Sequence, residues 1–161
     1  MQSRPEYLIQ SLQLRPHPEG GHYGEIHRST LLVSPADGRR GRAALTSIYF
    51  LLADGELSRW HRLRSDEAWH FLEGDPLELF SADAAFEAIE TTRLGPYDGS
   101  ARPLHVIERG QWQAARSTGA YTLVGCTVGP GFDYGDFQLL RDLGQEAAEA
   151  RQKGPLVAAF I

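Results

Sequence analysis

The sequence is poor in cysteine, in long apolar runs and in basic residues, and each scarcity excludes a class of protein. Cys126 is the single cysteine among 161 residues, so the chain can form no internal disulfide. No stretch approaches the ~20 apolar residues of a membrane-spanning helix, and the N-terminal segment lacks the apolar block of a secretion signal. A formal net charge of -5 argues against a nucleic-acid binder with a basic surface. We therefore expect a cytoplasmic protein that binds neither nucleic acid nor a membrane.

The size and composition fit one globular domain that covers residues 1–161. A chain of this length buries about two thirds of its unfolded surface in a single core. The 17 glycines and 9 prolines indicate many turns between short elements. The one basic cluster, Arg39-Arg40-Gly41-Arg42, lies in such a turn, and we expect it to be solvated.

Short apolar segments recur at intervals of roughly eight to twelve residues, which is typical of β-sandwiches and barrels. One helix is predicted near each end of the chain. Ser3 and Glu6 have the spacing of a capping box at the start of a helix over Arg4–Gln13, and the segment Asp142–Lys153 is rich in Ala, Glu and Gln. The fold class is therefore all-β, with predicted strands at His22–Ser34, Ala44–Ala53, Leu57–Leu63, Glu67–Leu72, Leu77–Ser81, Phe86–Leu94, Leu104–Glu108, Trp112–Arg116, Tyr121–Val128 and Leu156–Ile161.

The first predicted strand carries two candidate binding residues. On a strand with regular alternation Tyr23, Glu25 and His27 share one face. Glu25 and His27 are therefore candidates for contacting a ligand. His17 lies in the preceding turn, which is rich in proline and glycine, and we expect its side chain to be exposed to solvent.

The densest group of residues suited to a site lies between Gly55 and Gly74. Its spacing runs Gly55, five residues, His61, one residue, Leu63, three residues, Glu67, six residues, Gly74. Polar side chains at a turn between strands are commonly solvated, so a lone histidine and glutamate would be weak evidence for a site. Gly55, His61, Glu67 and Gly74 together match the spacing of a known family motif, which indicates a site built around His61 and Glu67.

This spacing resembles the first signature motif of the cupin superfamily, in which a second histidine stands where this chain has Leu63. That motif places a histidine and a glutamate on neighbouring strands that point into a small β-barrel. A second cupin motif supplies a further histidine, and here Gly110 aligns with its glycine while Gln113 takes the histidine position. Leucine cannot bind a metal, and a glutamine carbonyl is a weak ligand for transition metals. The resemblance implies either no cofactor or one weakly bound divalent metal ion at His61, Glu67 and Gln113.

Several segments in chain order resemble one branch of the cupins that is known mainly as a domain of unknown function. The resemblance implies a cupin jelly-roll barrel of two antiparallel sheets, a pocket between the sheets, and pairing of two copies as a homodimer. It implies no assigned reaction, because one fold serves many functions. The matching segments are Glu19–Tyr23, Ser58–Arg62, Asp66–Phe71, Gly74–Leu77, Trp112–Ala115 and Leu123–Phe132.

If His61 lies beside Glu67 inside the barrel, the carboxylate can fix the imidazole tautomer and raise its pKa, which suits a general base. The resulting hypothesis is a small polar metabolite bound in the barrel, with metal-independent epimerase or isomerase chemistry on a sugar or sugar nucleotide. A divalent-metal-dependent isomerase or dioxygenase, and a non-catalytic binding or storage module, are the alternatives. His70 faces the pocket only if a bulge reverses the strand alternation. The candidate ligand contacts are Gln113, Trp69, Phe71, Tyr49, His70, His27 and Glu25.

Overall fold

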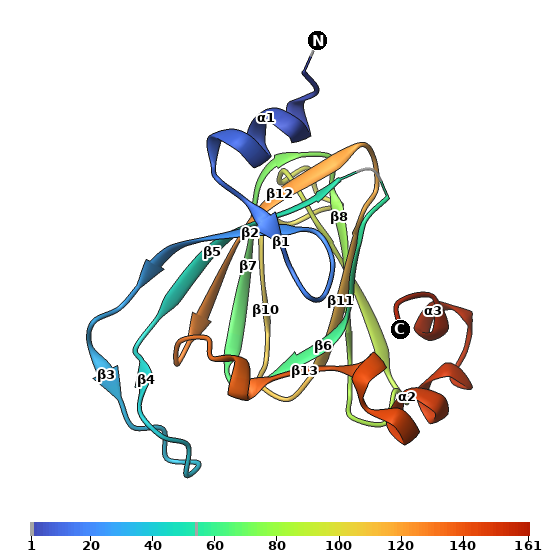
Figure 1. The fold of residues 1–161 in the computed structure, drawn as a ribbon. Helices are drawn as coiled ribbons and strands as arrows, with labels where there is room; N and C mark the ends of the chain where they lie inside the picture. Colours follow the sequence, from blue (N-terminus) through green and yellow to red (C-terminus); the bar gives the residue numbers. More distant parts are fainter. Residues whose placement is uncertain (1, 54) are drawn as a thin grey trace.

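The computed structural model describes residues 2–53 and 55–161, and most of its strands form two antiparallel sheets that face each other as a jelly-roll barrel (Figure 1). The predicted all-β fold class is confirmed. The six-stranded sheet contains, in spatial order, β1 (Arg15–Pro16), β2 (His22–Arg28), β5 (Thr46–Ala53), β12 (Tyr121–Gly129), β7 (Asp66–Gly74) and β10 (Leu104–Ile107). The five-stranded sheet contains β13 (Phe137–Leu139), β6 (Leu57–Leu63), β11 (Trp112–Ser117), β8 (Leu77–Ala82) and β9 (Ile89–Leu94).

Central strands of the six-stranded sheet are apolar because both of their faces are covered. On β5, Phe50 and Leu52 belong to the core between the sheets, whereas Leu51 packs on the outer face. This alternation is the period of two that a strand imposes on its side chains. The same core holds Leu77 and Leu79 of β8, and neither of these leucines lines the cavity described below.

A second apolar core covers the outer face of the five-stranded sheet, beneath the helices α2 (Gly144–Arg151) and α3 (Pro155–Ala159). The predicted C-terminal helix is confirmed as α2, although it is shorter than expected. The predicted strand at Leu156–Ile161 is wrong. Pro155 begins a helix there, and the three-residue spacing of Val157 and Phe160 brings both side chains into the core that contains Trp60.

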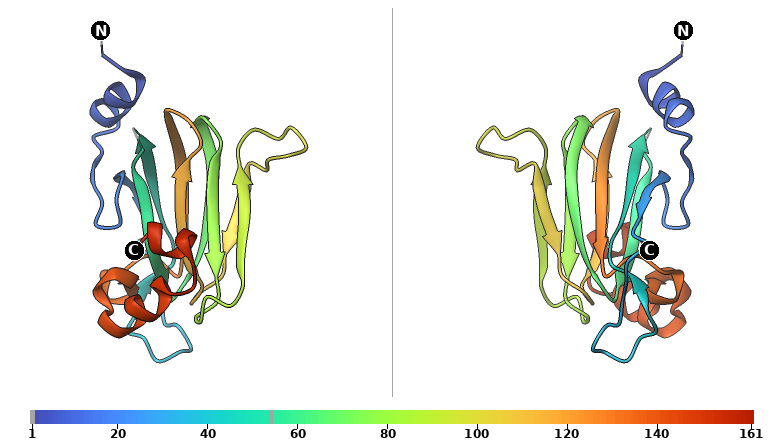
Figure 2. Two further views of the ribbon diagram at one scale, coloured as in Figure 1. Left: turned by 90° about the vertical axis from the view of Figure 1, so that its right-hand side faces the viewer. Right: turned by 90° about the vertical axis from the view of Figure 1, so that its left-hand side faces the viewer.

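The helix α1 (Arg4–Ser11) covers part of the outer face of the six-stranded sheet. The predicted capping box is present: Ser3 Oγ accepts a hydrogen bond from the Glu6 backbone N–H, and the Glu6 carboxylate accepts one from the Ser3 N–H. Leu8 packs against Leu51 and Leu123. Figure 2 shows α1 and α2 toward opposite ends of the strands. Within the described residues no helix is long and apolar enough to cross a membrane.

The long strand predicted over His22–Ser34 is divided in the structure. β2 ends at Arg28, and β3 (Leu32–Val33) pairs with β4 (Arg42–Ala43) in a separate hairpin. The pairing of β2 with β5 also shifts register between Glu25 and His27. A shift of this kind reverses the side-chain alternation beyond it, so Glu25 and His27 do not share a face.

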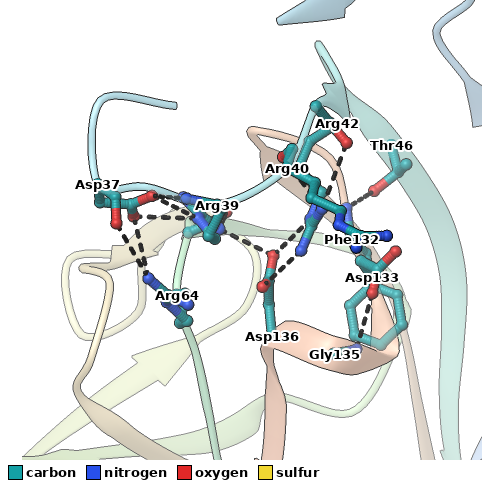
Figure 3. A network of polar contacts seen from close by, with 12 residues as sticks. Asp37, Arg39, Arg40, Arg42, Thr46, Arg64, Phe132, Asp133, Gly135 and Asp136 are labelled. Atoms are coloured by element: carbon teal, nitrogen blue, oxygen red, sulfur yellow. Dashed lines mark hydrogen bonds and ion pairs between the residues drawn. The ribbon is translucent and has the colours of Figure 1, made fainter. Parts of the chain in front are cut away.

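A buried carboxylate anchors the loop at the tip of the β3–β4 hairpin (Figure 3). Arg39 Nη1 and Arg42 Nε each donate a hydrogen bond to Asp136 Oδ2 at 2.9 Å, and Arg42 Nη2 donates to Oδ1 at 3.0 Å. The Arg39 side chain is only 3% exposed, so the expectation of a solvated basic cluster is wrong for this residue. These bonds tie the hairpin to the segment that follows β12. The structure comprises one chain, and the homodimer stays a prediction.

Candidate functional site

A cavity of about 310 Å³ lies between the two sheets, which is a volume suited to a small molecule. Its buried end, here called the floor, is formed by the polar side chains of Glu19, His61 and Glu67. Its outer end, here called the rim, carries Arg15 and Tyr134, both of which are exposed. The wall between floor and rim is mostly apolar.

β6 places His61 at the floor, and the backbone fixes its tautomer. His61 Nδ1 lies 2.8 Å from the carbonyl oxygen of Arg59, which can only accept a hydrogen bond. Nδ1 therefore carries the ring proton, and Nε2 is the unprotonated nitrogen of the neutral imidazole. His61 Nε2 lies 3.3 Å from Glu19 Oε2, while Ser58 Oγ donates a hydrogen bond to Glu19 Oε1 at 2.7 Å. The expectation that Glu67 fixes the tautomer is therefore wrong.

Glu19 reaches the floor from the loop between β1 and β2, because two glycines let that loop approach the barrel closely. Gly20 and Gly21 have φ angles of 114° and 68°, in the left-handed region that favours glycine. A Cβ atom on Gly20 would lie 2.0 Å from the carbonyl oxygen of Leu57, so a side chain at that position would collide with β6. Glu19 was not among the candidate residues predicted from the sequence. The glycine pair that follows it could have indicated a loop that approaches the barrel closely.

The same loop carries His17 into the cavity lining. Its side chain is 6% exposed, and its Nδ1 accepts a hydrogen bond from the Glu19 backbone N–H at 3.2 Å. The ring packs edge-on against Tyr23 and Phe137, with ring centroids 4.7 and 5.8 Å apart. The expectation of an exposed loop histidine is therefore wrong, because the loop folds inward.

Gln113 holds Glu67 in place from behind the cavity. Gln113 Nε2 donates a hydrogen bond to Glu67 Oε2 at 2.6 Å, and Trp69 Nε1 donates to Gln113 Oε1 at 2.8 Å. Pairing of β11 with β6 sets Gln113 opposite His61. Both ends of the Gln113 amide are thus engaged with protein groups, which makes it a positioning residue for Glu67.

Burial controls the ionisation of the floor, because the charged form of each group loses its hydration there. It raises the pKa of Glu19 to about 8 and that of Glu67 to about 7. It lowers the pKa of His17 to about 3 and also lowers that of His61, where it outweighs the opposing effect of Glu67. The expected rise in the His61 pKa is therefore wrong. Near neutral pH the floor therefore presents an uncharged imidazole beside a Glu19 carboxyl that is mostly protonated and a Glu67 carboxyl that is about half protonated.

Polar groups ring the mouth of the cavity. The hydroxyl oxygens of Tyr23 and Tyr134 lie 3.4 Å apart and bridge β2 to the segment after β12. The Arg15 guanidinium lies 5.0 Å from the centre of the Tyr23 ring, a cation–π contact. Glu25 Oε2 accepts a hydrogen bond from Arg28 Nη2 at 2.8 Å. The rim therefore offers hydroxyl groups and a guanidinium to whatever enters.

The structure brings four of the predicted site residues together and leaves the others outside. His61, Glu67, Trp69 and Glu25 line the cavity. Gln113 lies behind Glu67 and does not line it.

Four predicted contacts are corrected by the course of the strands. Tyr49 packs on the outer face of the six-stranded sheet, against the cluster beneath α1. His70 also points outward, because the register shift in β7 comes at Leu72, beyond His70. Phe71 packs against the core between the sheets, and His27 is exposed beyond the register shift in β2. None of these four side chains lines the cavity.

The predicted metal ligands do not converge as a metal centre. Gln113 uses both ends of its amide on Trp69 and Glu67, so of the three predicted ligands only His61 Nε2 and the Glu67 carboxyl face the cavity. Across residues 2–53 and 55–161, no group of three or more His, Cys, Asp or Glu side chains is arranged to hold a metal ion. The weakly bound divalent metal at His61, Glu67 and Gln113 stays a prediction.

Comparisons with known proteins place the chain in a family. The sequence profile described as "Cupin superfamily (DUF985)" matches residues 6–140. A protein from Shewanella oneidensis has a similar solved structure, with 33% identity over 99% of this chain and 98% of that chain and a TM-score of 0.83. A hypothetical protein from Leishmania major is also 33% identical, over 91% of this chain and 96% of that chain, with a TM-score of 0.78.

A more distant structure shares the fold alone. A cupin 2 conserved barrel domain protein from Rhodopseudomonas palustris is 18% identical over 89% of this chain and 81% of that chain, with a TM-score of 0.55. No curated protein matches the chain. The profile match spans most of the chain and agrees with the jelly-roll barrel and its internal cavity. The chain therefore belongs to the cupin superfamily, in the family described as DUF985.

Proposed function

We propose that the protein binds a small metabolite bearing a carbonyl group in its cavity and catalyses proton transfer on it, as an epimerase or isomerase without a metal ion. A sugar or sugar nucleotide, as predicted from the sequence, is one substrate of this class. The observation that carries the proposal is the unprotonated Nε2 of His61 at the cavity floor, beside the carboxyl groups of Glu19 and Glu67. Enzymes that move protons near neutral pH need acids and bases whose pKa values lie in that range.

The reaction needs one base and one acid on the same substrate. His61 Nε2 takes the proton from the carbon next to the carbonyl, and the electron pair of the broken C–H bond forms the double bond of an enol. Glu67 gives its proton to the carbonyl oxygen as that bond forms. For an epimer, water gives a proton to the other face of the carbon, His61 Nε2 releases its proton to water, and Glu67 takes the hydroxyl proton of the enol as the carbonyl re-forms. For an isomer of an α-hydroxy carbonyl compound, His61 Nε2 gives its proton to the former carbonyl carbon, and Glu67 takes the proton of the neighbouring hydroxyl group as the new carbonyl forms. Each cycle restores His61 and Glu67 to their starting states.

Neighbouring residues fix the tautomer of His61 and the position of the Glu67 carboxyl. The Arg59 carbonyl keeps the His61 proton on Nδ1, so that Nε2 stays free to accept one. Gln113 fixes the Glu67 carboxyl with a hydrogen bond of 2.6 Å. Glu19 Oε2 lies 3.3 Å from the same nitrogen of His61 and can accept a hydrogen bond from the imidazolium that forms there.

Exchange of carbon-bound hydrogen in deuterated water tests the proposal. The probes are D-fructose, D-fructose 6-phosphate and phenylacetone, each of which has exchangeable hydrogen next to a carbonyl. We expect the protein to accelerate exchange of at least one probe, followed by proton NMR. We expect His61→Ala to slow that exchange by about 100-fold or more, since a general base contributes about that much.

A matched control uses a histidine outside the cavity. His27→Ala removes an exposed imidazole of β2 and should leave exchange unchanged. The Gln113→Leu variant should slow exchange without abolishing it, because Glu67 loses its hydrogen-bond donor but remains present. Absence of exchange with every probe, or exchange that survives in His61→Ala, contradicts the proposal.

A further inference from the structure

The wall of the cavity differs in character from its floor and its rim. Between these two polar ends the lining side chains are mainly hydrocarbon, contributed by both sheets and by the segment that joins β12 to β13. Six of the lining side chains consist of hydrocarbon alone: Ile48, Phe50, Leu63, Val128, Phe132 and Phe137.

The hydroxyl group on this wall is already used by the protein. Thr46 lines the cavity, and its Oγ1 accepts a hydrogen bond from the Phe132 backbone N–H at 2.9 Å. A molecule lying against the wall therefore meets hydrocarbon on Ile48, Leu63 and Val128 rather than donors and acceptors. A hydroxyl group of the ligand placed there would lose its bonds to water and gain none in return.

Aromatic side chains on the wall favour a ligand that itself contains an aromatic ring. Phe50 comes from β5 in the six-stranded sheet, and Phe137 comes from β13 in the five-stranded sheet. Phe132 packs against Phe137 with ring centroids 5.9 Å apart and an interplanar angle of 62°. Both Phe50 and Phe137 pack against the His17 ring, with ring centroids 6.0 and 5.8 Å from it, so the wall carries a cluster of aromatic rings. Such a cluster favours a ligand with an aromatic body, because aromatic pairs gain more than their buried area alone provides.

We propose, building on the proposed function, that the substrate is a compact carbonyl compound with an apolar body, preferably aromatic, and with its reactive polar group at one end. The carbonyl end meets His61 and Glu67 at the floor, and the hydrocarbon body lies against the wall. This class is narrower than the carbonyl metabolites of the proposed function. It disfavours free sugars, which carry a hydroxyl on nearly every carbon.

Competition between two matched probes tests this class. Phenylacetone has one carbonyl and an aromatic body, whereas D-fructose has a carbonyl and hydroxyl groups along the whole chain. Titration with ligand-observed NMR gives the Kd of each probe, and the deuterium exchange of each is recorded in the same samples. We expect phenylacetone to bind at least about tenfold more tightly, because its body replaces water on the wall without leaving hydroxyl groups unpaired.

A pair of valine substitutions tests whether phenylacetone binds against the cavity wall. Val128→Thr replaces a methyl by a hydroxyl on the cavity wall and should raise the phenylacetone Kd about fivefold. Val106→Thr makes the same change on β10, outside the cavity lining and 45% exposed, and should leave the Kd unchanged. An unchanged Kd in Val128→Thr overturns the proposed contact with the wall.

The outcomes separate this inference from the proposed function. Preferred binding of phenylacetone together with its exchange supports both. Preferred binding of phenylacetone without exchange of any probe supports the ligand class and overturns the proton-transfer function. Fructose binding that equals or exceeds phenylacetone binding overturns the ligand class, while exchange of fructose in that case upholds the proton-transfer function. Failure of both probes to bind overturns the ligand class.

Discussion

Asp136 and Glu67 are both buried carboxyl groups, but Asp136 lies between two guanidinium groups whereas Glu67 lies beside neutral groups and a second carboxyl. The bonds from Arg39 and Arg42 hold the pKa of Asp136 below its usual range, so this carboxyl stays ionised (Figure 3). Burial raises the pKa of Glu67 to about 7, because the hydration lost by its charged form outweighs the opposing effects of His61 and Gln113.

The difference shows that burial alone does not decide what a carboxyl group does. With guanidinium partners, Asp136 joins two segments of the chain and has no proton to give near neutral pH. Without them, Glu67 keeps its proton until near neutrality, at some cost in stability, and faces a cavity that a substrate can enter. Proteins place such perturbed groups where proton transfer is needed, which supports the proposed chemistry at the floor.

The largest expected effect comes from removing the Asp136 carboxylate, whose charge is compensated by two guanidinium groups. Asp136→Ala leaves Arg42 without its ion-pair partner and Arg39 with Asp37 alone, and it should lower the free energy of unfolding by about 3 kcal/mol. Urea denaturation at pH 7 measures the loss. Between pH 5 and 8 the loss should stay constant, because this carboxyl is ionised in both the folded and the unfolded chain. Asp142→Ala, at an exposed carboxyl on the surface, is the control; an equal effect of both variants would contradict the comparison.

A smaller and pH-dependent effect on stability is expected at Glu67, which has no guanidinium partner among the described residues. The pKa of Glu67 is raised from 4.5 to about 7 on folding, so the folded chain binds more protons between these values. Stability from this group is therefore complete below about pH 4.5 and is lost as the pH rises to about 7. Glu67→Gln does not titrate, and it should gain on the order of 2–3 kcal/mol relative to the wild type between pH 5 and 8.

Urea denaturation at pH 5, 6.5 and 8 measures that gain. His17, His61 and Glu19 titrate in both proteins, so their contributions largely cancel in the difference. Asp136→Ala provides the matched control, since its difference from the wild type should not change over the same range. A Glu67→Gln difference that is equally flat would show that the Glu67 pKa is not raised.

The smallest expected effect concerns the hydrogen bond that holds Glu19. Ser58 Oγ donates to Glu19 Oε1 at 2.7 Å, and this bond lowers the pKa of Glu19 against the larger effect of burial. Ser58→Ala should lower the free energy of unfolding by about 1 kcal/mol and raise the Glu19 pKa further. Denaturation, with carbon-13 NMR of the labelled carboxyl, measures both changes. In a Glu19→Gln background the effect of Ser58→Ala on the free energy of unfolding should no longer depend on pH. A pH dependence that remains would have to come from another group.

Much of the architecture could be read from the sequence because it depends on local patterns. The short strands from β5 to β12 were predicted within a few residues, and the capping box of Ser3 and Glu6 was present as expected. Strand alternation also placed Glu67 and Trp69 on one face, and both line the cavity. The strand expected at the C-terminus failed, because apolar residues in a short run fit a buried helix as well as a strand.

The candidate site was predicted only in part. His61 and Glu67 were found from their spacing, whereas Tyr49 lies on the outer face of its sheet, and Phe71 shares the inner face of Glu67 but packs into the core outside the cavity. His27 was misplaced because a single register shift in β2 reverses the faces beyond it, and sequence alternation gives no warning of such a shift.

The sequence by itself determined the all-β class, the central pair His61 and Glu67, and the loss of the usual histidine at Leu63 and Gln113. These follow from patterns along one chain. Only the tertiary structure decided that Glu19 reaches His61 and that Asp136 receives two arginines. Each of those contacts joins residues far apart in sequence, and the pKa of a buried carboxyl depends on which partners meet it in space.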